Sequence, residues 1–126
     1  MSEAGGGGTV IESEAACIFC RIVRGEIPAN EVARTADAVA FRDLNPQAPA
    51  HILVVPVRHF ANLGDFVAAS AHDEVGHVLA LASRVGREAS PNGYRVVINE
   101  GVDGGQTVSH LHLHVLAGRA MHWPPG

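Results

Sequence analysis

Residues 109–116, SHLHLHVL, constrain the fold more than any other segment of the chain. His110, His112 and His114 alternate with leucine or valine, which is the two-residue period of a β-strand whose faces differ. Three interpretations are open: a metal site, a nucleophilic catalyst, or a half-solvated strand with histidine as its polar residue. The outer two histidines of a strand stand about 13 Å apart. One zinc ion, which needs nitrogens about 2 Å away, therefore fits poorly between all three.

Four further strands are predicted upstream of this segment. A turn at Ala36–Asp37 divides residues 31–43 into two short strands. Residues 51–57 and 94–100 are rich in β-branched side chains and are each expected to form one strand. Hairpin-length links between most of these strands favour an antiparallel arrangement.

Two helices are expected beside the strands. Residues 17–25 carry apolar side chains at helical spacing and predict a short helix that stops at Gly25. Ser70 and Asp73 have the spacing of a capping box, which would open a longer helix ending before Pro91. Its predicted apolar stripe consists of Val75, Val78, Leu79, Ala82 and Val85. The elements together predict an α+β fold, a five-stranded antiparallel sheet with one short and one long helix on one face.

The composition is that of one globular domain. The chain has 126 residues, 47% hydrophobic and 17% charged, with a Gly- and Glu-rich start that predicts a flexible tail over 1–14 and a single domain over 15–126. A net charge of −4 argues against a nucleic-acid-binding protein. The apolar runs are too short to span a membrane, and no secretory signal is evident, so we expect a cytoplasmic protein. Cys17-x-x-Cys20 suits metal or redox chemistry there.

A glycine-rich loop precedes the histidine segment and suggests a phosphate site. Gly104 and Gly105 could let backbone N–H groups approach an anion, and Thr107 and Asn99 offer a hydroxyl and an amide. A histidine facing such a pocket is a plausible nucleophile toward phosphorus, since neutral imidazole is abundant near pH 7. The same glycines could instead serve only a hairpin turn.

The segment QTVSHLHLHVLAGR resembles the signature of the histidine triad (HIT) family of nucleotide hydrolases and transferases, and specifically its Hint branch. The resemblance extends over residues 17–126, with further matching blocks at FRDLNPQAPAHILVVP, YRVVINEGVDGGQ and MHWPPG. It implies the HIT-like fold, in which the sheets of two chains are joined across a homodimer.

The resemblance also implies a reaction. A Hint-type enzyme cleaves the P–N bond of purine nucleoside 5′-phosphoramidates, of the AMP-lysine or AMP-NH2 type, and releases a nucleoside monophosphate. His112 corresponds to the nucleophile that forms a covalent nucleotidyl-histidine. His114 corresponds to the group that hydrogen-bonds the phosphate or leaving group, while His110 orients the nucleophile and His51 braces the set.

Further sites follow from the same resemblance. Trp123 is expected to influence leaving-group choice, and a structural zinc is implied at Cys17, Cys20, His59 and His110. Without the two histidines, two reduced, partly buried thiols would be the favoured interpretation of the cysteines. The apolar members of the nucleotide site could equally be core residues. The nucleotide-binding residues implied are Phe19, Ile22, Phe41, Asp43, Leu44, Asn99, Gly105, Gln106, Thr107 and Leu113.

Two other functions are compatible with these residues. One is a nucleotide-binding regulatory or scaffold protein whose hydrolase activity is vestigial. The other is a zinc hydrolase in which the histidines activate water. The intact triad argues against the first, and the strand geometry argues against the second.

Overall fold

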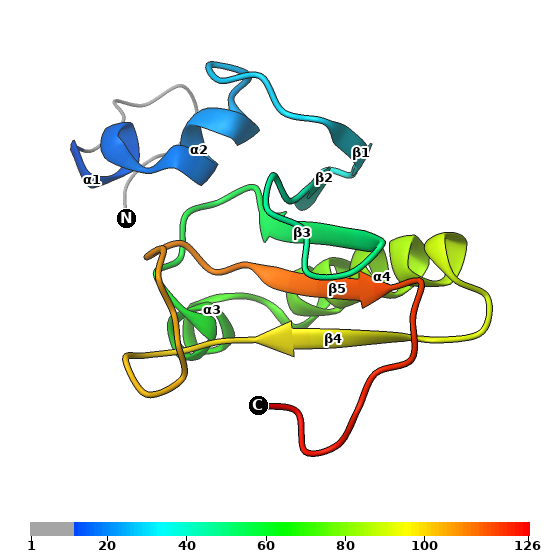
Figure 1. Ribbon diagram of the computed structural model, residues 1–126. Coiled ribbons are helices and arrows are strands. Elements are labelled where there is room, and N and C mark those ends of the chain that lie inside the picture. Colours follow the sequence, from blue (N-terminus) through cyan, green and yellow to red (C-terminus); the bar gives the residue numbers. More distant parts are fainter. Residues whose placement is uncertain (1–11) are drawn as a thin grey trace.

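The computed structural model describes residues 12–126 and contains the expected five-stranded antiparallel sheet. The spatial order is β1-β2-β3-β5-β4, so the last strand of the chain inserts between β3 and β4 (Figure 1). β4 consequently forms one edge of the sheet and β1 the other. The strands are β1 (Glu31–Arg34), β2 (Ala38–Arg42), β3 (Ala50–Pro56), β4 (Tyr94–Ile98) and β5 (Leu113–Ala117).

Within residues 12–126, four helices accompany the sheet, two more than the sequence predicted. The two expected helices are present, and an additional helix precedes each of them. Residues 12–14 of the predicted tail belong to the first additional helix, while residues 1–11 lie outside the described residues. The helices are α1 (Glu12–Ala16), α2 (Ile18–Val23), α3 (Leu63–Ala69) and α4 (His72–Ala89). No helix within residues 12–126 is long and apolar enough to cross a membrane.

Helices pack against both faces of the sheet, so the prediction that the helices cover one face is wrong. α4 packs behind the sheet, whereas α2 lies on the other side, above the end of β3 (Figure 1). Alternate residues of β3 serve the two cores, Ile52 and Val54 facing α4 and Leu53 and Val55 facing α2. This double burial explains why the β3 sequence is a continuous apolar run rather than an alternating one.

The predicted capping box at Ser70 is also wrong. Ser70 ends α3, and its buried Oγ has no hydrogen-bond partner among the described residues. α4 begins after Ala71, which provides no side-chain cap. Ser70 is unavailable because the unpredicted helix α3 ends there, only two residues before α4 begins. The predicted α4 stripe is wrong only at Leu79, which is 49% exposed while Leu81 is buried in its place; the other four residues of the stripe pack on the core.

The fifth strand is shorter than predicted. β5 begins at Leu113, so His110 and His112 lie in the extended segment before it and only His114 is in the strand. Alternation is nevertheless retained: Leu111 and Leu113 face the α4 core, and His114 pairs with Leu53 on the α2 side. His110 is fully buried and His112 is 7% exposed. The half-solvated strand is thereby excluded for these two histidines.

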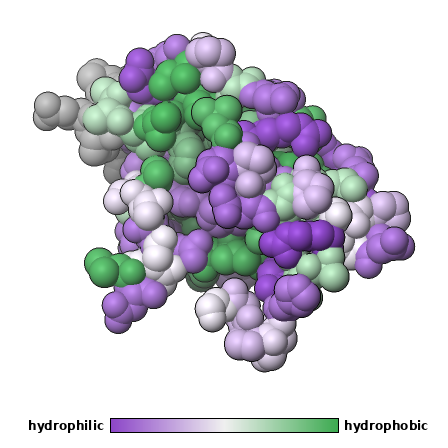
Figure 2. Space-filling model, viewed as in Figure 1, coloured by the Kyte–Doolittle hydropathy of each residue, from purple (hydrophilic) through white to green (hydrophobic). Residues whose placement is uncertain are grey.

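Hydrophobic side chains gather around α2 and the adjacent strands, while hydrophilic ones occupy the middle of the same face (Figure 2). The apolar group beneath this helix contains Phe19, Val23, Val39, Phe41, Leu53 and Val55. The His112 ring packs against Phe19 of this apolar group on one side and against His114 on the other, and such a meeting of apolar and polar groups is typical of a ligand site.

The contact between α4 and β4 yields a paired test of the packing. A Cβ added at Gly86 would lie 2.6 Å from ring carbons of Tyr94, whose hydroxyl donates to Ser83 Oγ. We expect Gly86→Ala to lower the free energy of unfolding by about 1–3 kcal/mol. Gly76→Ala, at an exposed position of the same helix with no atom within 4 Å, should raise it by about 0.8 kcal/mol. Urea denaturation measures both changes, and equal effects would contradict the packing described.

Candidate functional site

The ring of His112 is held by a hydrogen bond at one nitrogen, while its other nitrogen has no partner among the described residues. Its Nδ1 lies 2.8 Å from the backbone oxygen of His110. A carbonyl only accepts, so the proton is on Nδ1 and the lone pair of the neutral ring is on Nε2. The ring packs edge-on against Phe19, with centroids 5.1 Å apart, and against His114 at 5.0 Å. Nε2 makes no hydrogen bond within residues 12–126 and can act as a nucleophile.

His51 and His114 form a second ordered pair of rings. The backbone N–H of Gln47 donates to His51 Nδ1 over 3.0 Å, so the proton of the neutral His51 ring is on Nε2. That Nε2 lies 2.9 Å from His114 Nδ1, which must therefore accept. The proton of His114 is consequently on Nε2. The pair presents an N–H donor, whereas His112 presents a lone pair.

Asp43 lies beside this pair. Its Oδ2 is 3.5 Å from His51 Nε2, and its Oδ1 accepts from the backbone N–H of Asn45 at 2.8 Å. By distance alone, Asp43, His51 and His114 could hold a metal ion. The Gln47 N–H argues against this, because it places the His51 proton on the nitrogen that would have to bind the metal. The geometry favours a hydrogen-bonded chain over a metal site here.

The pair of His51, which is buried, and His114, which is half-buried, predicts a loss of stability in acid. Burial lowers the pKa of His114 to about 4 and lowers that of His51 as well. A folded-state pKa below the unfolded value of 6.5 means that the unfolded chain binds protons first, so stability is full above about pH 6.5 and falls toward about pH 4. A shift of this size corresponds to about 3 kcal/mol, and partial exposure reduces the expected loss to about 2 kcal/mol.

Urea titrations between pH 4 and pH 7.5 measure this loss. His114→Asn removes one titrating ring and should show a shallower decline than the wild-type protein. Identical pH profiles for the two proteins would contradict the assigned burial of His114.

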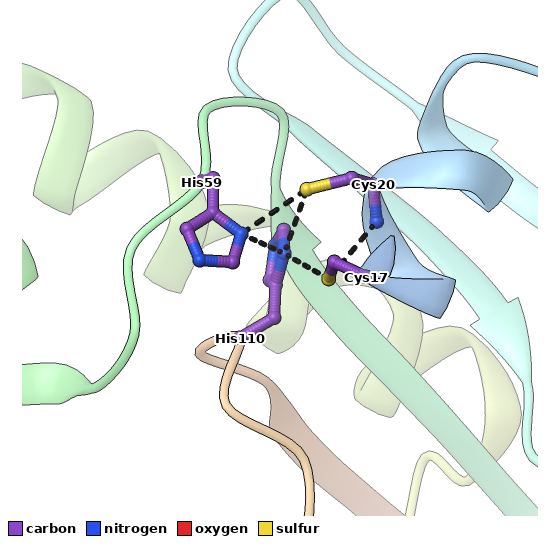
Figure 3. Close-up of side chains that lie close together, drawn as sticks. All are labelled: Cys17, Cys20, His59 and His110. Carbon is purple, nitrogen blue, oxygen red and sulfur yellow. Dashed lines mark hydrogen bonds between the residues drawn. The ribbon is translucent and has the colours of Figure 1, made fainter. Parts of the chain in front are cut away.

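The ring of His110 belongs to a second cluster of side chains, which it forms with Cys17, Cys20 and His59 (Figure 3). Cys17 and Cys20 project from the start of α2, His59 from the loop after β3, and His110 from the segment before β5. Their donor atoms all lie within 4.8 Å of one another. The sulfur of Cys20 is 3.1 Å from His59 Nδ1 and 3.4 Å from His110 Nδ1, and the two Nδ1 atoms are 3.1 Å apart.

These distances are within a few tenths of an ångström of those in a tetrahedral zinc site. Bonds of about 2.1 Å to nitrogen and 2.3 Å to sulfur imply donor separations of about 3.4–3.8 Å, slightly longer than the two separations of 3.1 Å. His110 Nε2 lies 3.3 Å from the backbone oxygen of Pro56 and donates its proton to it. A hydrogen bond of this kind orients a metal-binding histidine and leaves its other nitrogen, here Nδ1, available to the metal. Two thiols and two imidazoles complete four-coordination and leave no open position for water, as in a structural site.

Ionisation of the cluster agrees with this assignment. Burial lowers the pKa of His59 and lowers that of His110 to about 4, so both imidazoles are neutral at pH 7, as metal ligands must be. Burial, with a contribution from the neighbouring Cys17, raises the pKa of the Cys20 thiol to about 12. A bound cation would reverse this shift, because it stabilises the thiolate directly.

The apolar nucleotide-site residues are only partly brought together. Phe19 contacts the His112 ring and, at 5.7 Å, Phe41, and Ile22 packs on the same group. Leu44 is 96% exposed in the loop between β2 and β3. The side chain of Leu113 points into the α4 core, opposite His114, so a contact of this residue with a nucleotide would have to be made by its backbone.

The glycine-rich loop is explained first by its own geometry. A Cβ at Gly104 would lie 2.1 Å from the backbone oxygen of Glu100, and Gly105 has a φ of +81°. Asn99 Nδ2 donates to Gly104 O at 2.6 Å, which leaves its second N–H for a ligand. Thr107 is exposed and could offer its hydroxyl.

Gln106 has a different position from the one expected of a phosphate donor. Its Nε2 donates to the backbone oxygens of Ala61 and Val108, at 2.6 and 3.0 Å, and its Oε1 accepts from the N–H of Gly101. Its side chain therefore holds the loop in shape rather than pointing a free donor at a ligand.

Within one chain, Trp123 lies away from the site histidines of that same chain. It is 83% exposed in the segment after β5, which turns back alongside β4 (Figure 1). Arg95 of β4 holds this segment by donating to the backbone oxygen of His122 at 2.6 Å.

Sequence reasoning missed the backbone groups that set the ring tautomers. Gln47 acts through its N–H, and Pro56 and His110 act through their carbonyls. Every residue other than proline has such an N–H, and every residue has a carbonyl, so no side-chain pattern could have identified them.

Comparisons with known proteins show the family of the chain. A model described as HIT domain matches residues 24–121. A 14 kDa zinc-binding protein of Zea mays is 46% identical over 111 residues, which is 86% of this chain and 87% of the relative.

Two solved structures share the fold. A HIT family hydrolase from Legionella pneumophila has a TM-score of 0.78 and 42% identity, covering 87% of this chain and 99% of its own. A histidine triad nucleotide-binding protein from Candida albicans has a TM-score of 0.73 and 30% identity, covering 86% of this chain and 83% of its own.

Proposed function

This chain belongs to the histidine triad (HIT) family, and from that premise we propose that it hydrolyses the P–N bond of purine nucleoside 5′-phosphoramidates, as a member of the Hint branch. The observation that carries the proposal is the state of His112, whose Nδ1–H is held by a backbone carbonyl so that Nε2 offers a lone pair. Catalysis by attack on phosphorus needs a nucleophile in that state.

The reaction would proceed in two displacements. His112 Nε2 forms a bond to the α-phosphorus as the P–N bond breaks, and the leaving nitrogen takes up a proton and departs as the amine. Water then attacks the same phosphorus, releases a proton to the solvent and breaks the P–Nε2 bond, which frees the nucleoside monophosphate and the neutral His112 ring. The Nε2–H of His114, set by the hydrogen bond from His51, would donate to the phosphoryl oxygen or the leaving nitrogen, where charge develops.

The nucleotide would lie between α2 and the histidines. Phe19, Ile22 and Phe41 offer an apolar wall for a purine. Asp43, with its carboxylate beside His51, would accept from the ribose hydroxyls. Asn99, Thr107 and the backbone at Gly105 would bind the phosphate, in a loop held by Gln106. The Candida albicans relative, named as nucleotide-binding, supports this class of ligand.

The metal assigned to the second cluster would be structural. Bound there, zinc would supply cross-linking between α2, the loop after β3 and the segment before β5. His110 belongs to both clusters: its ring faces the cysteines, and its carbonyl holds His112. The maize relative, named as zinc-binding, supports the choice of ion.

A cytoplasmic homodimer is the proposed form of the protein. β4 is an edge strand that pairs only with β5 in the described chain, so its other side is free to continue the sheet. Val96 on this strand is 38% exposed, and Trp123 lies in the segment beside it. In such a dimer, Trp123 would reach the partner's site and influence leaving-group choice.

A substrate panel tests the activity. Purified protein should hydrolyse adenosine 5′-phosphoramidate and lysine-linked AMP and release AMP. Trp123→Ala should change the ratio of rates between leaving groups rather than abolish turnover. Nucleotide binding without hydrolysis of any P–N substrate would contradict the proposal and favour a regulatory nucleotide-binding protein.

A further inference from the structure

The backbone of Gln47 makes two hydrogen bonds that connect His51 to the end of β5. Its N–H donates to His51 Nδ1 at 3.0 Å, and its carbonyl accepts from Arg119 Nη2, also at 3.0 Å. The loops meet closely at this point, because a Cβ at Gly118 would lie 2.9 Å from Pro49 Cβ. The residue thus has a fixed position between two loops, and its side chain donates from Nε2 only to the backbone oxygen of Asn45, at 3.0 Å in the same loop.

The N–H of Gln47 determines where protons lie two rings away. It can only donate, so His51 Nδ1 must accept and the His51 proton is at Nε2. Asp43 Oδ2, 3.5 Å from that Nε2, favours the same tautomer electrostatically. The His51 N–H in turn makes His114 Nδ1 an acceptor at 2.9 Å. His114 Nε2 carries the remaining proton and has no hydrogen-bond partner in the described part of the chain.

We propose that Gln47, through its backbone N–H, and Arg119, through the Gln47 carbonyl, are positioning residues that fix the tautomers of His51 and His114. The inference rests on the proposed function in one respect: a His114 with its proton on Nε2 presents a donor to the phosphoryl group. The opposite tautomer would present a lone pair to negatively charged oxygens and oppose binding of the transition state. A backbone group thereby sets the polarity of a side chain at the reacting centre.

Gln47→Pro removes the backbone N–H of this residue. Gln47→Ala removes the side chain and keeps the backbone N–H. Two-bond ¹H–¹⁵N correlation spectra of the imidazoles, recorded without substrate, report which nitrogen carries the proton. We expect Nε2–H at His51 and His114 in the wild-type protein and in Gln47→Ala, and a mixture of tautomers in Gln47→Pro. In that variant kcat should fall by at least about tenfold with little change in KM, because the missing donor acts on the transition state.

A second variant is needed because a proline placed directly after Pro46 can distort the loop. Arg119→Gln serves this purpose, since Arg119 is exposed and donates to the Gln47 carbonyl. It should shift the tautomers in the same direction by a smaller amount. An Nδ1–H tautomer at His114 in the wild-type protein would overturn the inference. So would unchanged tautomers in a Gln47→Pro protein that circular dichroism shows to be folded. Because the spectra need no turnover, a wild-type protein with Nε2–H tautomers and no P–N hydrolysis would overturn the proposed function alone.

Discussion

Replacing His112 with alanine is expected to lower kcat for adenosine 5′-phosphoramidate by about 10⁴-fold or more, the largest effect of any single substitution in the chain. The ring forms the bond to phosphorus through Nε2, whereas the accepting nitrogen of His110, which also packs against Phe19, is turned toward Cys17 and Cys20. Steady-state kinetics measures the loss, and calorimetric titration with AMP should show affinity within a few-fold of the wild-type value.

Neighbouring histidines supply the matched controls. His114→Ala and His51→Ala should cost less in kcat, because these rings assist the transition state and form no bond to phosphorus. All three variants should keep the wild-type far-UV circular dichroism spectrum. If His112→Ala retained turnover comparable to that of His114→Ala, the nucleophile would be another group.

Loss of the metal site should have the largest effect on stability. We expect Cys20→Ala, or removal of zinc by a strong chelator, to lower the free energy of unfolding by about 4 kcal/mol, the value for an ion present at about 1,000 times its Kd. The reason is that Cys17 and Cys20 fasten the six-residue helix α2 to His59 and His110 of the sheet layer. Thermal unfolding with and without chelator measures the loss as a fall in Tm of roughly 15 °C.

Metal analysis and a chelation control complete this experiment. Wild-type protein should contain about one zinc per chain, and the Tm of Cys20→Ala should not respond to chelator. Chelated protein that remains folded at low temperature should still form the nucleotidyl adduct. Complete loss of turnover at unchanged stability would instead support a zinc hydrolase.

The sheet was predictable because its strands have strong local signals. The turn at Ala36–Asp37 does separate β1 from β2, and the apolar run after His51 does form a central strand. The Cys17-x-x-Cys20 spacing indicated metal chemistry, and the resemblance added His59 and His110, which the fold brings beside the thiols.

Other features depended on tertiary context. Helix α3 has an apolar pattern too short to separate from a loop, and its presence removed Ser70 from the start of α4. The alternation at 110–114 predicted a polar face, but α2 covers that side and buries His110 and His112. Burial by a helix distant in sequence cannot be read from the period of the strand.

Acid quenching of a single turnover tests the central claim most directly. Protein mixed with a ³²P-labelled adenosine phosphoramidate and quenched within milliseconds should carry label on His112 as an acid-labile phosphorus–nitrogen adduct. Peptide mapping locates the label, which should be absent from His112→Ala. Rapid AMP release by the wild-type protein with no protein-bound label at any quench time would contradict covalent catalysis by His112.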